Sequence, residues 1–167
     1  MKKVIVIGCP GSGKSTFSRA LQQITGLPLF HLDTLYWNPD GTTVPEKTVF
    51  QTRLHAAMSG DRWIIDGNYG STMEQRMMAC DTVIFLDYPT ELCLDGIKAR
   101  KGKPRPDMPW NNSAEDGDEE FVSFIKDYPS KSRPMVLELL KKYSHKNIVI
   151  FKTRQDADAF LQTISNK

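Results

Sequence analysis

The chain has 167 residues, of which 40% are hydrophobic and 25% charged, values typical of a single globular domain with a core of its own. Its 22 basic and 20 acidic residues leave a net charge of +2, so the overall charge gives no reason to expect a nucleic-acid-binding protein. No apolar run approaches the roughly 18 residues that cross a membrane. The number of cysteines is odd, and their spacings fit neither a metal site nor a disulfide framework. This favours a reducing compartment, by default the cytoplasm.

The first expected unit is a strand, a loop and a helix. Val4–Ile7 is an apolar run that predicts a buried strand, and it leads directly into Gly8-Cys9-Pro10-Gly11-Ser12-Gly13-Lys14-Ser15. This is the GxxxxGK[ST] phosphate-binding pattern, in which glycines let backbone N–H groups surround a phosphate. A helix is expected over residues 14–25, because apolar residues recur there at helical spacing before Gly26. The amino terminus of this helix would face the same anion.

This loop predicts ATP and Mg²⁺ as ligands. Lys14 is expected to reach the β- and γ-phosphates and to act in catalysis, and Ser15 to supply a hydroxyl group to the metal. The residues expected to contact the nucleotide are Gly8, Pro10, Gly11, Ser12, Gly13, Lys14, Ser15 and Thr16.

A second strand is expected over Leu27–Leu32, followed by a helix near residues 46–59. Asp33 comes directly after this strand, and ligands of open α/β sheets collect at the carboxyl ends of the strands. Asp33 is therefore a candidate for binding or deprotonating the phosphoryl acceptor, with a helix cap or turn as the alternative. His31 is interpreted as a packed or surface residue, and Tyr36-Trp37 as candidates for an acceptor pocket.

The third and fourth expected strands both end in an acid. Trp63–Asp66 and Thr82–Asp87 have the same apolar pattern before their aspartate. If the third strand lies beside the first, Asp66 lies next to Ser15 and holds magnesium. Asp87 is the rival candidate for this role. Asn68-Tyr69, just past the third strand, is a further candidate for the acceptor pocket.

Helices are expected near residues 71–79 and 90–101, and the segment 98–117 then departs from the pattern. It has no apolar period, and Pro104, Pro106 and Pro109 interrupt it. This segment is expected to be a lid that closes over phosphates and excludes water, or else an ordinary surface loop. Catalytic arginines are expected around it: Arg100 and Arg133 as catalytic residues and Arg105 as a contact to the nucleotide.

The remaining elements complete an alternation of strands and helices. Helices are expected near 117–126 and 131–143, then a strand over Asn147–Phe151 and a helix over 154–165, for which Thr153 and Asp156 read as a capping box. Alternation along the whole chain indicates parallel strands joined by helical crossovers, and hence an α/β protein with five strands.

Taken together, the segments GCPGSGKST, LDTLYW, WIIDGNY, VIFLDYP and RPDM resemble the nucleoside monophosphate kinase-like branch of the phosphate-loop proteins, which contains adenylate kinase and shikimate kinase. More narrowly, they resemble the bacterial family of DNA topology modulation (FlaR-like) proteins, which are related to adenylate kinase. The resemblance implies a three-layer phosphate-loop NTPase fold, with a parallel sheet in the order 2-3-1-4-5 and helices on both faces, as one domain over 1–167 with a closing lid. It also implies Mg²⁺ and ATP as ligands, and likens Arg100 to an arginine that follows the fourth strand in adenylate kinases.

The chain departs from adenylate kinases where they bind the acceptor's phosphate and the adenine. Tyr36 and Gly70 stand where adenylate kinases carry arginines for the acceptor, and Gly96 stands where an arginine commonly stacks on adenine. The expected function is thus an ATP-dependent kinase with a small-molecule or nucleoside acceptor. The alternative is a nucleotide-binding regulator associated with DNA, supported only by the basic cluster from Lys98 to Arg105, without a recognisable DNA-reading module.

Overall fold

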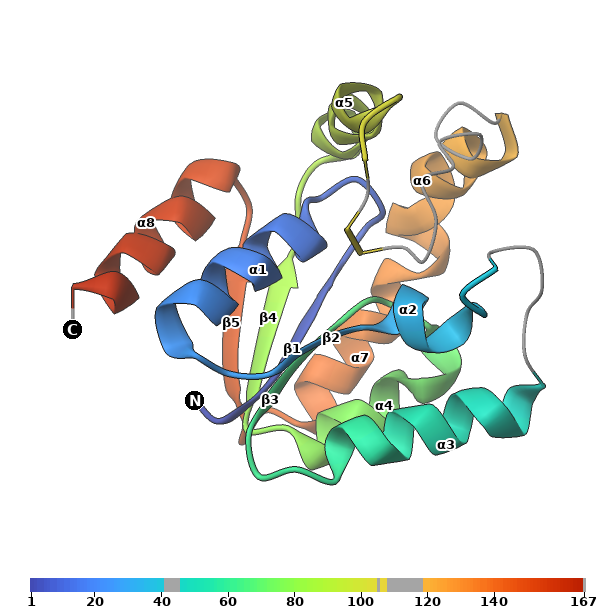
Figure 1. The fold of residues 1–167 in the computed structure, drawn as a ribbon. Coiled ribbons are helices and arrows are strands. Elements are labelled where there is room, and N and C mark those ends of the chain that lie inside the picture. Colours follow the sequence, from blue (N-terminus) through green and yellow to red (C-terminus); the bar gives the residue numbers. More distant parts are fainter. Residues whose placement is uncertain (41–45, 105, 108–118, 167) are drawn as a thin grey trace.

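The computed structural model describes residues 1–40, 46–104, 106–107 and 119–166. Five parallel strands form one sheet in the order β2-β3-β1-β4-β5, which confirms the expected fold class and strand order (Figure 1). The strands are β1 (Lys3–Gly8), β2 (Leu29–His31), β3 (Trp63–Asp66), β4 (Thr82–Leu86) and β5 (Asn147–Phe151). Their carboxyl ends therefore meet at one edge of the sheet, where ligands of such folds bind.

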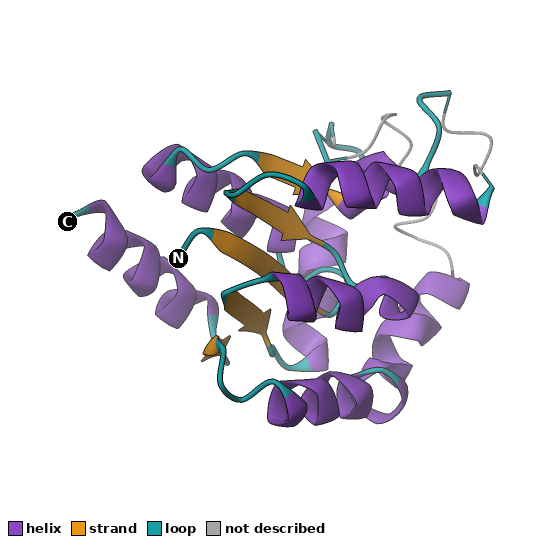
Figure 2. Cartoon of the chain, turned by 90° about the horizontal axis from the view of Figure 1, so that it is seen from below, coloured by secondary structure: helices purple, strands orange, loops and turns teal. Residues whose placement is uncertain are grey.

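Helices cover both faces of the sheet (Figure 2). Alternate residues of β1 point to opposite faces: Val4 and Val6 belong to one apolar core, and Ile5 and Ile7 to the other. The first core contains residues of α1 (Lys14–Thr25), α5 (Thr90–Arg100), α6 (Glu119–Lys131) and α8 (Arg154–Ser165). The second contains residues of α2 (Leu32–Tyr36), α3 (Lys47–Met58), α4 (Gly70–Ala79) and α7 (Arg133–Lys142). The central strands are thus buried on both sides, as a parallel sheet requires.

The ends of α1 and α8 follow local chemistry. Gly26 ends α1 with φ of +66°, a left-handed conformation that glycine adopts without strain. Thr153 caps α8, because its hydroxyl oxygen accepts a hydrogen bond of 3.1 Å from the N–H of Asp156. Both helices have the bounds expected from the sequence.

Two segments differ from the expected elements. The second strand ends at His31, and the chain turns at once into α2, so Asp33 lies in the first turn of a short helix. Leu32, which is fully buried, fixes this helix against the second core. Helix α6 runs to Lys131, beyond the expected end near 126, because Ile125 and Tyr128 both pack into the first core and Pro129 is accommodated near the end of the helix.

Within the described residues, no helix is long and apolar enough to cross a membrane.

Candidate functional site

The phosphate-binding loop joins β1 to α1 and packs directly on α5. Gly11 and Gly13 have φ of +82° and +89°, which place their N–H groups in a curl that other residues adopt only with strain. A Cβ atom at Gly11 would lie 2.1 Å from the carbonyl oxygen of Cys93, and one at Gly96 would lie 2.0 Å from that of Gly11. Gly96 thus serves the close approach of α5 to the loop.

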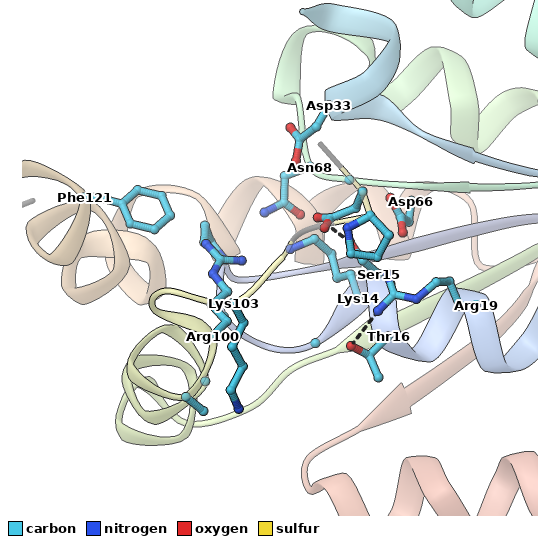
Figure 3. A pocket seen from close by; sticks show the side chains of 18 of the residues that line it. Lys14, Ser15, Thr16, Arg19, Asp33, Asp66, Asn68, Arg100, Lys103 and Phe121 are labelled. Atoms are coloured by element: carbon cyan, nitrogen blue, oxygen red, sulfur yellow. Dashed lines mark hydrogen bonds between the residues drawn. The ribbon is translucent and has the colours of Figure 1, made fainter. Parts of the chain in front are cut away.

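The loop forms one side of a pocket of about 760 Å³ at the carboxyl ends of the strands. Among the predicted residues, those that line it are Pro10, Gly11, Gly13, Lys14, Ser15, Thr16, Asp33, Asp66 and Arg100. Gly8 and Ser12 belong to the same loop but are not among the described residues that line the pocket; the N–H of Gly8 donates to Oδ1 of Asn68 at 3.1 Å. Figure 3 shows residues of the loop, of β3 and of α5 converging on this space.

Lys14 lies inside the pocket and is folded back onto its own loop. Its Nζ donates to the carbonyl oxygens of Gly8 at 2.9 Å and Cys9 at 3.2 Å. Burial lowers the pKa of the Lys14 ammonium, and the carboxylate of Asp66 opposes this shift. The amine is therefore held at the loop by hydrogen bonds that a phosphate ligand can replace.

Asp66 lies beside the loop, as expected from a third strand that neighbours the first. In the β1–β3 pairing Asp66 is opposite Val6, two residues before the loop begins, and its side chain lines the same pocket as Ser15. Its Oδ2 is 2.8 Å from Nδ1 of His31. Burial lowers the pKa of His31, but the hydrogen bond to Asp66 and the charges of Asp66 and Asp107 together outweigh burial and raise that pKa. His31, interpreted from the sequence as a packed or surface residue, thus orients the candidate metal-binding carboxylate.

Asp87 lies elsewhere, in an ion-pair cluster. Its two carboxylate oxygens accept hydrogen bonds of 2.8 Å from Nε and Nη2 of Arg133, and Nζ of Lys152 contacts the same carboxylate. Neither Asp87 nor Arg133 is among the described residues that line the phosphate-loop pocket. Arg133, expected to act as a catalytic arginine, is instead paired with the acid that was the rival of Asp66.

This ion-pair cluster predicts a pH-dependent stability. Burial raises the pKa of Asp87, but hydrogen bonds from Arg133 and Lys152 outweigh it, and the pKa is lowered overall. A lowered pKa in the folded state stabilises the fold above the unfolded value near pH 4, and this contribution is lost as the pH falls through the folded-state pKa. Asp87→Asn is therefore expected to reduce the free energy of unfolding by about 1–3 kcal/mol at pH 7, and by progressively less below pH 4.

Urea denaturation of both proteins at pH 7 and at pH 3 measures this effect. Asp127→Asn is the matched control, because Asp127 pairs with Lys131 on an exposed helix face, where an ion pair contributes about 0.5 kcal/mol or less. An equal loss of stability at both pH values for Asp87→Asn would contradict the ion-pair explanation.

The pocket is also lined by residues that follow β2 and β3, namely Asp33, Asn68, Tyr69 and Trp37. The hydroxyl of Tyr69 donates to Oδ1 of Asp33 at 2.5 Å. The ring of Tyr69 packs against those of Tyr36 and Phe50, with centroids 4.9 Å and 5.5 Å apart. Tyr69 thus orients Asp33, and the ring of Tyr36 helps to hold Tyr69 in place.

Two arginines donate hydrogen bonds to backbone carbonyls in the segments that carry Trp37, Asn68 and Tyr69. Arg53 on α3 donates to the carbonyl oxygens of Leu35 at 3.0 Å and Trp37 at 3.3 Å, and to Oδ1 of Asn38. Arg76 on α4 is fully buried and donates to the carbonyl oxygens of Gly67, Asn68 and Tyr69. Burial lowers the pKa of Arg76 to about 10, so the group stays charged at neutral pH. Both arginines fasten the loops that carry the pocket residues.

Basic side chains from α5 and α1 complete the pocket. Arg100 lies 5.9 Å above the ring of Phe121, and both it and Lys103 line the pocket (Figure 3). Arg19 donates from Nη2 to Oγ1 of Thr16 at 3.3 Å, and its Nη1 is buried without a hydrogen-bond partner among the described residues. Arg105 and most of the expected lid, 108–117, lie outside the described residues. The part that is described brings Asp107 to the pocket.

Comparisons with known proteins bear on the fold that carries this pocket. No family model matches the chain. The shikimate kinase of Rhodococcus jostii (strain RHA1) is 29% identical over 98 residues, which are 51% of this chain and 58% of that protein, so the chain spans little more than half of this curated relative. The solved shikimate kinase of Acinetobacter baumannii, in complex with shikimate, superimposes with a TM-score of 0.64 over 100% of this chain and 95% of that one, at 21% identity.

The chain has the shikimate kinase fold. A second solved shikimate kinase, from Bacteroides thetaiotaomicron, superimposes with a TM-score of 0.59 at 17% identity, over 98% of this chain and 96% of that one. These similarities agree with the branch of phosphate-loop proteins that the sequence motifs indicated, while the narrower resemblance to DNA topology modulation proteins stays a prediction.

The sequence did not single out several residues that the structure brings to the site. His31 and Arg19 stand in segments whose apolar pattern predicts only packing. Arg53 and Arg76 lie on helices outside the motif segments. The one available signal was for Asp107, which belongs to the RPDM segment; nothing in that segment indicated a contact with Ser15.

Proposed function

We propose that the chain is an ATP-dependent phosphotransferase that acts on a hydroxyl group of a small molecule. The observation that carries the proposal is one pocket that holds both the phosphate-binding loop and the carboxylate of Asp33. Phosphoryl transfer depends on positioning and on neutralising negative charge, and this pocket offers cations beside an acid that can accept a proton.

The residues of the pocket fit Mg²⁺ and ATP. The loop has the left-handed glycines of a phosphate cradle, and Arg19, whose buried Nη1 has no hydrogen-bond partner among the described residues, also lines the pocket. The hydroxyl of Ser15 and the carboxylate of Asp66 are oxygen donors of the kind that Mg²⁺ prefers. When bound, Mg·ATP supplies the phosphoryl group and a cation that neutralises it.

The other side chains take the following roles in the proposal. Lys14 exchanges its bonds to the loop carbonyls for phosphate oxygens and neutralises developing charge. Arg100 on α5 and Lys103, just after that helix, add positive charge. Asp33 accepts the proton of the attacking hydroxyl group, with Tyr69 fixing the direction of the carboxylate. Arg105 and the expected lid remain part of the proposal as residues that exclude water.

The acceptor in this proposal is a neutral or cationic hydroxyl compound. A phosphorylated or carboxylated acceptor needs a cation near Asp33, and the two arginines of α3 and α4 already donate to backbone carbonyls. The carboxylate of Asp33 would repel such an anion. Asn68, Tyr69 and Trp37 offer hydrogen bonds and ring surfaces instead, which suit a nucleoside, a polyol or an amino alcohol.

The test is ATP consumption by the purified chain against a panel of acceptors, with ³¹P NMR of the product. The panel contains neutral nucleosides, sugars and amino alcohols, the five common nucleoside monophosphates, and shikimate as an anionic hydroxyl compound. We expect turnover with one or more neutral or cationic acceptors. Turnover with the anionic compounds alone would contradict the acceptor class, and no acceptor-dependent turnover with any compound would contradict the kinase.

A DNA-associated regulator has less support among the described residues. Arg100 and Lys103, two members of the basic cluster that suggested it, line the nucleotide pocket. DNA binding that weakens steeply with salt, in a chain without acceptor-dependent ATP turnover, would favour it.

A further inference from the structure

Asp107 is held against the hydroxyl group of the phosphate-binding loop. Oγ of Ser15 donates to Oδ2 of Asp107 at 3.0 Å, although the two residues are 92 positions apart. The backbone oxygen of Asp107 accepts a second hydrogen bond, of 3.2 Å, from Oγ1 of Thr34 on α2. Asp107 is only 7% exposed. Contacts from α1 and α2 therefore fix both the side chain and the backbone of this residue.

A second carboxylate lies in the same pocket. Asp66 is 4% exposed and is oriented by His31, and the charges of Asp66 and Asp107 both act on that imidazole. Within the described residues, no group of three or more acidic, histidine or cysteine side chains forms a complete metal site. A site built from only two carboxylates, those of Asp66 and Asp107, leaves most of the metal's coordination positions open. This suits Mg²⁺, because the ion keeps several waters and takes further oxygens from phosphates.

We propose that Asp107 is a second carboxylate of the magnesium site, binding the ion directly or through a metal-bound water. The inference rests on the proposed function and extends it. Mg²⁺ binds oxygens at about 2.1 Å in an octahedron, so two neighbouring ligand oxygens lie about 3 Å apart. The 3.0 Å between Oγ of Ser15 and Oδ2 of Asp107 equals this separation. The two atoms are thus spaced as neighbouring ligands of one ion.

Charge gives the same conclusion independently. The hydroxyl of Ser15 belongs to the loop that surrounds the phosphates, so the Asp107 carboxylate lies close to where polyphosphate binds. Without a cation between them, these negative charges repel. With Mg²⁺ present, the same carboxylate attracts the ion. Asp107 therefore weakens the binding of metal-free ATP and strengthens the effect of magnesium.

Replacement of Asp107 by asparagine separates these two effects, because Asn keeps the size and an oxygen acceptor for Ser15. The test is calorimetric titration of wild type and Asp107→Asn with ATP, once in EDTA and once in excess Mg²⁺. We expect the variant to bind metal-free ATP more tightly and to lose about tenfold of the magnesium enhancement. Binding of Mn²⁺, measured from the EPR signal of the free ion in the presence of ATP, should weaken in parallel.

Two further variants make the result specific. Asp95→Asn removes a charge from the same pocket on α5 and should leave the magnesium enhancement close to that of wild type. Asp107→Glu keeps the charge and should restore part of the enhancement.

Equal magnesium enhancement in wild type and Asp107→Asn would overturn the inference and leave the proposed function standing. Weaker ATP binding by the variant in both EDTA and Mg²⁺ would indicate a purely structural role for Asp107 and would also overturn it. If the wild type binds no ATP under either condition, the proposed function fails, and this inference fails with it.

Discussion

Replacing Lys14 by alanine is expected to lower phosphoryl transfer by at least about a hundredfold, the typical cost of removing one charge-stabilising donor. The amine of Lys14 lies at the loop, where it donates to two backbone carbonyls. Because Lys14 is the one basic residue in the loop sequence Gly8–Ser15, no other residue of the loop can supply this charge. The initial rate of acceptor-dependent ATP consumption measures the loss.

The control for Lys14→Ala is Lys141→Ala, because Lys141 is exposed on α7. It should retain the wild-type rate, and thermal melting should show that both variants are folded. A rate near that of wild type for Lys14→Ala would contradict the assignment of the loop.

Asp33→Asn is expected to lower kcat by about a hundredfold to ten-thousandfold, the range associated with loss of a general base, while the affinity for ATP changes little. The amide cannot accept the hydroxyl proton, yet it keeps the size of the carboxylate. Because Asp33 is not part of the phosphate-binding loop, the contacts of the loop with the nucleotide remain. Steady-state kcat with the best acceptor and calorimetric Kd for ATP measure the two effects separately.

Tyr69→Phe is the informative partner of Asp33→Asn. It removes the hydrogen bond of 2.5 Å to Asp33 but keeps the ring that packs against Tyr36 and Phe50. If the hydroxyl of Tyr69 only orients Asp33, Tyr69→Phe should lower kcat less than Asp33→Asn does. Equal loss of kcat and ATP affinity in Asp33→Asn would place Asp33 in the nucleotide site and contradict its role toward the acceptor.

The sequence predicted most of the fold because its signals are local and regular. Apolar runs mark the strands of a parallel sheet. Both the buried strand Trp63–Asp66 and the partly exposed edge strand Asn147–Phe151 were therefore recognisable to the residue. The same logic failed around His31, because the run Leu27–Leu32 is continuously apolar apart from that residue. Periodicity cannot show that the chain leaves the sheet there and turns into α2.

The site was predictable where one motif carries several functions, and less so where partners come from distant segments. Lys14 and Ser15 follow from the loop pattern alone. The strand order does not by itself separate Asp66 from Asp87, because β3 and β4 both pair with β1. Arg133 could not be placed in the same way, because its pairing with Asp87 joins residues 46 positions apart. The contact of Asp107 with Ser15 likewise depends on how the segment after α5 folds back.

The buried arginine of α4 bears on how readily such a protein could acquire a new substrate. Arg76 holds three successive carbonyls, those of Gly67, Asn68 and Tyr69, so turning it toward a phosphorylated acceptor would release the loop that positions Tyr69. A natural or engineered variant that phosphorylates nucleoside monophosphates would instead need an additional basic residue to bind the phosphate of the acceptor. Gly70, likened above to an acceptor-binding arginine of adenylate kinases, is the first position to test, because a Cβ there would displace only the flexible end of Met135 on α7, at 3.3 Å. Redesign should therefore begin with Gly70→Arg and leave Arg76 untouched.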